Sequence, residues 1–159
     1  MVKGKKYVVL ISSSERSFVV ATLNKMVKMK KAGLVVDLFG HPNWIKQNYG
    51  TDKLQALNTF ITSSYKVDYK SAAVIGFVRK YRKIYGFEPD EYSFKGFDTG
   101  FYFAKLLAKY GVNYTNYLTK ETYKGLHNSF SFVYDERNGY INTSLMLLKY
   151  RDYALHIVQ

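Results

Sequence analysis

Two short runs of branched apolar residues near the N-terminus most constrain what this chain can fold into. The runs YVVLIS (7–12) and LVVDLFG (34–40) are typical of strands covered on both faces. Between them Val19 and Leu23 recur with helical spacing, and Gly33 is placed to end a helix. A strand, a helix and a strand in this order predict a β-α-β unit with parallel strands and a right-handed crossover. The expected fold class is therefore α/β.

Two further helices are predicted in the middle of the chain. Residues 71–85 have the apolar spacing of an amphipathic helix, and Gly86 follows as its C-cap. A second helix is predicted over residues 91–110. It contains Gly96 and Gly100, and each glycine costs roughly 1 kcal/mol relative to alanine in a helix interior. Because these glycines are four residues apart, they share one face, and we expect a neighbouring element to approach closely there. The helix has little polar surface: one apolar face comprises Phe94, Phe97, Phe101, Ala104 and Leu107, and another comprises Phe103, Leu106 and Tyr110.

The other segments predict strands separated by loops. Residues 41–57 are expected to form a loop with one helical turn, and residues 58–65 a strand. Residues 112–129 are polar, with a short helical turn at most. Residues 130–159 predict three strands separated by turns at DERNG and YRDY, and Asn138-Gly139 is a strong hairpin signal. The fold expected is a parallel β-α-β sheet unit with flanking helices and a C-terminal antiparallel hairpin.

The charge of the chain raises the question of nucleic-acid binding. The formal net charge is +12 at pH 7, and the sequence contains 16 Tyr and 11 Phe, which can stack on bases between basic residues. The basic residues, however, fall mainly on the outer sides of two predicted helices, which is typical of a solvated face. We therefore do not favour a nucleic-acid partner. These residues are Lys25, Lys28, Lys30, Lys31, Arg79, Lys80, Arg82 and Lys83.

The sequence carries no pattern of catalytic or metal-binding residues. His41, His127 and His156 are far apart, and none has a second ligand at metal spacing. The tripeptide DTG at 98–100 resembles the catalytic turn of aspartic proteases, but it lies within a helical pattern. We expect that tripeptide's aspartate on a polar stripe of the helix, and we predict no catalytic residue, no metal and no cofactor. The stripe would comprise Asp98, Tyr102, Lys105 and Lys109.

Two loops follow the first two predicted strands, at the sheet edge where open parallel α/β sheets bind ligands. Residues 12–14 offer serine hydroxyls and a helix N-terminus, which suit an anion or a carboxylate. Residues 40–44 offer an aromatic ring and two polar tips. Alternatively, the serines only cap the helix and the indole only covers the edge of the core. The candidate residues are Ser12, Ser13, Ser14, His41, Asn43 and Trp44.

The run AAVIGFVRKYRKIYGFEPDEYSFKGFDTGFYFAKLLAKYG (72–111) has an order of motifs that points to a known family. It resembles the type I periplasmic solute-binding proteins, the leucine/isoleucine/valine-binding class of ABC-transporter receptors. The preceding β-α-β unit and an Asn-Gly-Tyr near the last strands agree with the same fold. The matching elements are Phe77, Tyr81, Tyr85, Gly86, Pro89, Tyr92 and Gly96-Phe97-Asp98, with Phe97 where the family usually has Tyr.

The resemblance implies that this chain is the C-terminal portion, or fragment, of a longer protein. Such receptors have two doubly wound lobes joined by three hinge strands, and they need about twice this length or more. Residues 1–57 would be the remainder of the second lobe. Residues 58–91 would supply a hinge strand and an amphipathic helix, and residues 92–159 the packing helix and C-terminal strands of the first lobe.

The resemblance also implies a non-enzymatic module of the periplasm or cell envelope that binds a small polar solute and works with a membrane permease or an envelope protein. The six loop residues above would line one side of the cleft, and Phe97 and Asp98 would approach from the other. Amino-acid receptors of this family have a carboxylate after the strand that matches residues 34–39, whereas residues 40–44 contain none. An α-amino acid ligand is therefore in doubt, because a buried ammonium needs an anionic partner.

Two other functions stay open. One is a ligand-free structural or protein-interaction domain of a cell-envelope protein, including a peptidoglycan-associated one. The other is nucleic-acid binding through the basic and aromatic surface. The apolar excess of the helix at 91–110 further predicts that the isolated chain self-associates or rearranges to cover Phe97, Phe101 and Phe103.

Overall fold

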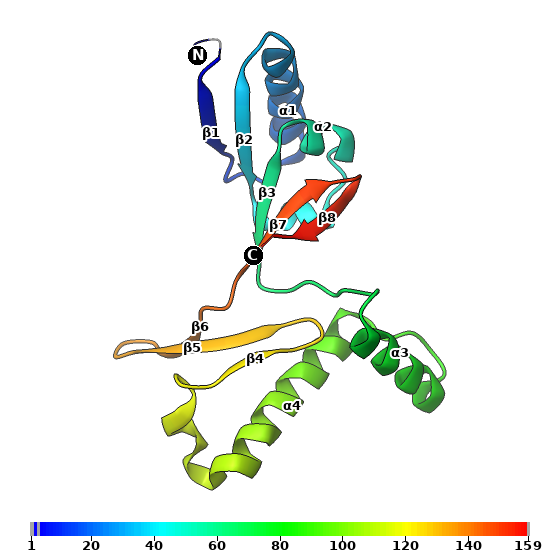
Figure 1. Cartoon of the computed structure of the whole chain (residues 1–159), viewed down its shortest axis with the longest axis vertical. Helices are drawn as coiled ribbons and strands as arrows, with labels where there is room; N and C mark the ends of the chain where they lie inside the picture. Colours follow the sequence, from blue (N-terminus) through cyan, green and yellow to red (C-terminus); the bar gives the residue numbers. More distant parts are fainter. Residues whose placement is uncertain (1, 3, 159) are drawn as a thin grey trace. The chain divides into compact units, whose positions relative to one another are not determined.

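The computed structural model describes residues 2 and 4–158, and the chain divides into two compact units (Figure 1). Unit 1 contains the residues up to Ser63 together with those from Met146 onward. Unit 2 contains residues Ser64–Leu145. The chain therefore leaves unit 1 once, forms unit 2, and returns to complete unit 1.

Unit 1 is built on one mixed sheet of five strands in the order β1-β2-β3-β7-β8. The first three strands are parallel, so the predicted parallel β-α-β unit is confirmed. Strand β7 then runs antiparallel to β3, and β8 antiparallel to β7. The strands are β1 (Lys6–Leu10), β2 (Val35–Gly40), β3 (Thr59–Ser63), β7 (Met146–Arg151) and β8 (Ala154–Ile157).

Helix α1 (Arg16–Lys31) connects β1 to β2 and packs Val19 and Leu23 into the core of unit 1. The C-cap is Ala32, and Gly33 follows with a φ of 97°, so a glycine ends the helix as the sequence predicts. The opposite face of β1 is bare, because Val8 is 68% and Leu10 is 74% exposed. The expectation that this strand is covered on both faces is therefore wrong: its side chains alternate between half-buried and exposed.

Residues between β2 and β3 are more helical than the sequence predicts. They form a 3-10 helix, η1 (Pro42–Lys46), and a short α-helix, α2 (Thr51–Ala56). Trp44 and Leu54 are buried in the core of unit 1. The expected loop thus folds as two short helical turns, because each contributes an apolar anchor to the core.

Unit 2 combines two helices with an antiparallel three-stranded sheet in the order β4-β5-β6. The bounds of both helices agree with the predicted ones. The hairpin turn at DERNG is also confirmed, and β4 is a strand that the sequence did not predict. The elements are α3 (Ala72–Tyr85), α4 (Glu91–Tyr110), the 3-10 helix η2 (Gly111–Tyr117), β4 (Thr122–Lys124), β5 (Ser129–Asp135) and β6 (Gly139–Asn142).

The face of α4 that packs inward agrees only in part with the predicted apolar faces, which share Phe94 and Leu106 with it. Its buried residues are Phe94, Asp98, Tyr102 and Leu106, and the ring of Tyr102 stacks on Phe130 with centroids 4.7 Å apart. Two residues of the expected polar stripe, Asp98 and Tyr102, therefore lie in the interior. This is possible because the Asp98 carboxylate and the Tyr102 hydroxyl both find hydrogen-bond partners there.

The predicted apolar face of α4 is instead largely exposed. Phe97 is 41% and Phe101 is 49% exposed. No heavy atom beyond the chain neighbours and the helix's own nearby backbone lies within 4 Å of the Cβ position of Gly96 or Gly100. The close approach expected at these glycines is therefore not made within the described residues.

The last predicted strands are divided between the two units. The sequence predicts one strand between the turns at DERNG and YRDY, but this stretch forms β6 in unit 2 and β7 in unit 1. Residues 143–145 carry the chain across. The expected grouping of residues 92–159 differs from this division, because β7 and β8 hydrogen-bond into the sheet of β3. The assignment of either unit to a receptor lobe stays a prediction.

Candidate functional site

The loops that follow β1 and β2 meet at the carboxyl edge of the parallel strands. The indole Nε1 of Trp44 donates to the carbonyl oxygen of Ser13 at 2.9 Å, and the hydroxyl of Tyr49 donates to the carbonyl oxygen of Ser14 at 2.8 Å. The structure thus brings together the two loops in which the sequence places candidate residues.

Trp44 itself serves the core of unit 1. Its side chain is fully buried, and its ring lies over the end of β2, where a Cβ on Gly40 would be 2.3 Å from the indole. This placement favours the interpretation that the indole covers the edge of the core. Its role toward a ligand would be to hold the serine loop in position.

The N-terminus of α1 is occupied by the side chain of Glu15. This carboxylate accepts hydrogen bonds from the backbone amides of Ser17 at 2.9 Å and Phe18 at 2.7 Å. These amides, with that of Phe18 contributing most, hold the pKa of Glu15 below its usual value. Glu15 is therefore the N-cap in place of a serine, and its negative charge argues against the expected anion site at residues 12–14.

Beside Glu15, the candidate side chains at this edge are hydroxyl, amide and imidazole groups. Ser12, Ser14 and Asn43 are exposed, and His41 is half-buried. The Nδ1 atom of His41 accepts from the backbone amide of Asn43 at 3.1 Å, so the neutral ring carries its proton on Nε2. The edge thus offers hydroxyl, amide and imidazole groups that donate and accept hydrogen bonds, next to the Glu15 carboxylate.

A broad, shallow depression of about 580 Å³ lies along the first turns of α1. Glu15 links this depression to the serine loop, because its backbone amide donates to the hydroxyl of Ser13 at 3.1 Å. Apart from Glu15, which follows the serines at capping-box spacing, the sequence patterns did not single out the lining residues. They are Glu15, Arg16, Ser17, Val20, Ala21 and Asn24.

The two remaining candidate residues, Phe97 and Asp98, belong to unit 2. Asp98 is fully buried, and its carboxylate accepts hydrogen bonds from the backbone amides of Leu126 at 2.8 Å, His127 at 2.7 Å and Asn128 at 2.8 Å. Three amide donors occupy this carboxylate, so it anchors a loop. Whether either residue contributes to a cleft with the loops of unit 1 stays a prediction.

A buried histidine lies beside this anchor. The ring of His127 stacks between Tyr65, with centroids 4.6 Å apart, and Phe94, with centroids 6.5 Å apart. Its Nε2 atom has no hydrogen-bond partner among the residues that the structure describes. Nothing in the sequence pattern around this histidine indicated burial, because its aromatic neighbours come from distant segments.

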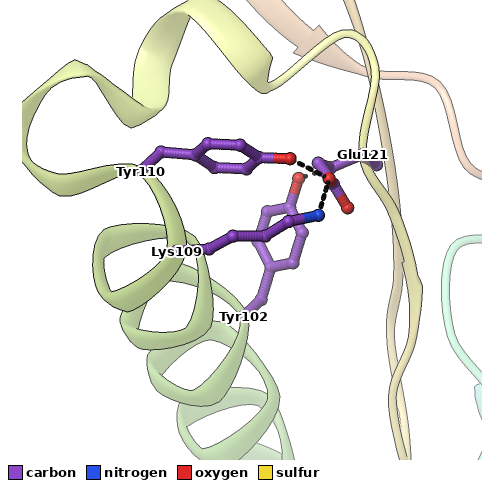
Figure 2. A network of polar contacts seen from close by, with 4 residues as sticks. All are labelled: Tyr102, Lys109, Tyr110 and Glu121. Atoms are coloured by element: carbon purple, nitrogen blue, oxygen red, sulfur yellow. Dashed lines mark hydrogen bonds and ion pairs between the residues drawn. The ribbon is translucent and has the colours of Figure 1, made fainter.

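A polar network joins the C-terminal end of α4 to the segment before β4 (Figure 2). The carboxylate of Glu121 accepts from Lys109 Nζ at 2.7 Å and from the hydroxyl of Tyr110, while the Tyr102 hydroxyl donates to the Glu121 carbonyl at 3.3 Å. Lys109, followed by Tyr110, holds the pKa of Glu121 below its usual value. The cavity beside this network measures only about 10 Å³, which leaves no room for a solute. The network is therefore structural.

In the described parts of the chain, no group of three or more His, Asp or Glu side chains is arranged to hold a metal ion. Within residues 2 and 4–158, no helix combines the length and the apolar character that crossing a membrane requires.

No protein-family model and no curated protein matches this sequence. Among solved structures, the chain is similar to one named as a branched-chain amino acid ABC transporter from Rhodospirillum rubrum. The TM-score is 0.53 and the identity 13%, over 93% of this chain and 49% of that chain. An ABC-transporter substrate-binding protein from Desulfitobacterium hafniense in complex with leucine gives a TM-score of 0.48 and 18% identity, over 95% of this chain and 43% of that chain. A solute-binding protein from R. palustris in complex with benzoate gives a TM-score of 0.41 and 12% identity, over 97% of this chain and 57% of that chain.

These comparisons establish the fold and the extent of the match. The TM-score of 0.53 confirms the resemblance to the periplasmic-binding-protein fold that the sequence indicates. The chain spans only 43% and 49% of the length of the Desulfitobacterium hafniense and Rhodospirillum rubrum proteins.

Proposed function

We propose that this chain is the solute-binding part of a receptor of the ABC-transporter type, acting without enzymatic chemistry. The observation that carries the proposal is the junction of the two loops, held by the hydrogen bond from Trp44 to Ser13 at the carboxyl edge of β1 and β2. In open parallel sheets this edge is the usual place for a ligand. The fold similarity to the Rhodospirillum rubrum protein, which is named as a branched-chain amino acid ABC transporter, supports the same role.

The chemistry of the edge favours a neutral polar solute. Ser12, Ser14 and Asn43 supply exposed groups that both donate and accept hydrogen bonds, and His41 adds a ring nitrogen. An anionic solute would meet Glu15, whose carboxylate already occupies the helix N-terminus. The ammonium of an α-amino acid would find no carboxylate in residues 40–44. A solute rich in hydroxyl or amide groups satisfies this edge best.

The test is a thermal-shift screen and calorimetric titration of the whole gene product against sugars, polyols, amides, α-amino acids and benzoate. We expect saturable binding of a neutral solute that weakens about tenfold in Asn43→Ala, the loss of roughly one hydrogen bond. Asn116→Ala, which removes an exposed asparagine in η2, is the matched control and should bind normally. Saturable binding of an α-amino acid that Asn43→Ala and Ser14→Ala leave unchanged would contradict the proposal.

A second candidate function, a ligand-free protein-interaction domain of the cell envelope, has its own structural support. The carboxylate of Asp98 is occupied by backbone amides of a loop, so it is not free to bind a solute. Aromatic side chains of α3 and α4 line an exposed groove. This candidate predicts no response to any solute in the screen.

In either case we place the protein in the periplasm or envelope, with a permease or an envelope protein as partner. Fractionation of cells that produce the whole gene product tests this location.

A further inference from the structure

His41 begins the turn that carries Trp44 into the core of unit 1. As the N-cap of η1, it accepts the backbone amide of Trp44 on its carbonyl oxygen at 2.9 Å and the backbone amide of Asn43 on its Nδ1 atom at 3.1 Å. The indole of Trp44 then donates to the carbonyl oxygen of Ser13 at 2.9 Å. The histidine ring is therefore linked, through one short turn, to the hydrogen bond that joins the two loops.

The ring can cap this turn only while it is neutral. A neutral imidazole has one nitrogen with a lone pair, and here that nitrogen is Nδ1, because it faces the N–H of Asn43. A protonated imidazole carries a hydrogen on both nitrogens, so Nδ1 would then present an N–H to another N–H. Protonation thus removes the cap of η1. Histidine side chains usually make this change between about pH 5 and about pH 8.

The ionisable groups around this turn act in both directions. Strand β3, which packs against η1, contributes none. A nearby carboxylate favours a charged imidazole, whereas a nearby cation opposes it. Because both kinds are present, the loss of the acceptor at Nδ1 decides which state of the ring fits the turn. The groups on the elements that adjoin η1 or are joined to it are Lys46 of η1 itself, Glu15 and Arg16 at the start of α1, Tyr49, and Asp37 of β2.

We propose that His41 is a pH-sensitive latch on the loop junction. The neutral ring keeps Trp44 against Ser13, and protonation of the ring loosens this contact. The indole transmits the change, because its ring is fully buried against Gly40 and a shift of the turn moves it among closely packed atoms. The meaning of the latch for a solute rests on the proposed function: the candidate site is then complete at neutral pH and weakened in acid.

Hydrogen exchange of the Trp44 indole N–H in the full chain tests the latch without any solute. The chain has a single Trp, so this proton gives one signal. Its protection factor, taken relative to the intrinsic exchange rate at each pH, should be about fivefold lower at about pH 5 than at about pH 8, the usual contribution of an N-cap. Backbone amides of the interior strands β2 and β3 report global unfolding and should keep their protection. An indole protection factor that is equal at both pH values, or a parallel loss in those amides, would overturn the proposal.

Variants of the histidines identify the group that titrates. His41→Asn offers an amide oxygen to the same backbone N–H but does not titrate, so its indole protection should be independent of pH. His41→Ala has no acceptor and should show the low protection at both pH values. His156→Asn removes another half-buried histidine, on β8, and as the matched control should keep the change with pH. A change that persists in His41→Asn, or disappears in His156→Asn, would refute the latch.

The same experiment separates the latch from the proposed function, because the exchange of the indole proton is measured in the absence of a solute. The expected loss of protection together with an empty solute screen would support the latch and contradict the proposed function alone. A solute found by the screen, with indole protection that does not respond to pH, would support the proposed function and contradict the latch alone.

Discussion

The carboxylate of Asp98 lies directly against Gly125, where a Cβ would sit 2.4 Å from the Asp98 Cγ atom. Because of this close contact, the Asp98 side chain of α4 can accept hydrogen bonds from the backbone amides of Leu126, His127 and Asn128 in the loop. The aspartate and the glycine are therefore a matched pair: the first anchors the loop, and the second leaves room for the anchor.

Gly125→Ala should destabilise the protein by about 1–3 kcal/mol, the usual cost of overpacking a tight interior site. The cause is the clash with Asp98, since the φ of Gly125 lies outside the left-handed range. Urea denaturation measures the change. In an Asp98→Ala background the added methyl has space, so Gly125→Ala should then change the free energy of unfolding little. If the losses of stability of the two single variants simply add in the double variant, the two residues are not coupled.

Asp98→Asn should lower the free energy of unfolding by about 2–3 kcal/mol. One carboxylate oxygen accepts from Leu126 and the other from His127 and Asn128, so an amide NH2 must face at least one backbone N–H. Asp135→Asn is the matched control. Its carboxylate also accepts from two backbone amides, but in a hairpin turn flanked by exposed residues, where water replaces what is lost. If the two variants lose equal stability, burial of Asp98 is not the reason for its cost.

Gly40→Ala should displace the indole of Trp44, because the new methyl would lie 2.3 Å from a ring carbon. We expect a loss of about 1–3 kcal/mol and a red shift of tryptophan emission as the ring gains contact with water. The chain has a single Trp, so its fluorescence reports this site alone. Unchanged emission and unchanged quenching by iodide would show that the ring and the strand adjust without opening the loop junction.

Acid should weaken the contact between Glu121 and Lys109. The pKa of Glu121 is lowered in the folded state, chiefly by Lys109, so its contribution to stability is present above its unfolded pKa of about 4.5. That contribution is lost as the pH falls through the lowered folded pKa. Glu121→Gln should therefore differ most from the wild type near pH 7 and converge with it as the pH falls through the lowered folded pKa.

The matched control for this pH dependence is Glu136→Gln, which removes an exposed carboxylate in the hairpin turn. Its effect on thermal unfolding should be small across the same pH range. A difference between wild type and Glu121→Gln that persists unchanged at low pH would mean that the ion pair is not its source.

Gly100→Ala should raise the free energy of unfolding by roughly 0.5–1 kcal/mol. The glycine lies within α4, and no heavy atom beyond the helix itself is within 4 Å of its Cβ position. A methyl group there adds helix propensity without a clash. A loss of stability, measured by denaturation of the isolated chain, would instead reveal a neighbour packed on this face in solution.

The helices were predictable because their start and stop signals are local. Ser71 caps α3 by accepting from the amide of Val74, Gly86 closes it, and Asp90 caps α4 by accepting from Ser93. Each signal lies within three residues of the position that it fixes. A single sequence therefore contains the whole interaction.

The buried face of α4 was not predictable from the sequence, because its partners are distant. In the sequence Asp98 has the character of a surface residue, but the loop at 125–128 supplies three amides to its carboxylate. Tyr102 is buried in the same way, because its hydroxyl donates to the carbonyl oxygen of Glu121. The apolar pattern alone favoured the face of Phe97 and Phe101, which is exposed. In the same way, no local sequence signal indicates that residues 143–145 separate β6 from β7.

The meeting of the two candidate loops was predictable from the sequence, but the contacts between them were not. The order strand, helix, strand places Ser14 and Asn43 at one sheet edge, and the contacts of Trp44 and Tyr49 with the serine loop bring their segments together. A serine was expected to be the N-cap of α1, whereas Glu15 takes that position. The choice between them depends on side-chain conformation, which the order of residues does not determine.

Ser63 and Met146 face each other in the pairing of β3 with β7, so the two chain ends of unit 2 leave unit 1 at adjacent points. Closing a flexible loop as long as residues 64–145 would cost roughly 4 kcal/mol of chain entropy. Prior folding of the inserted unit holds those ends within a smaller range and removes much of that cost. The last two strands of the sheet therefore dock most readily after the insertion has folded, and damage to the insertion should slow completion of a sheet to which it contributes no strand.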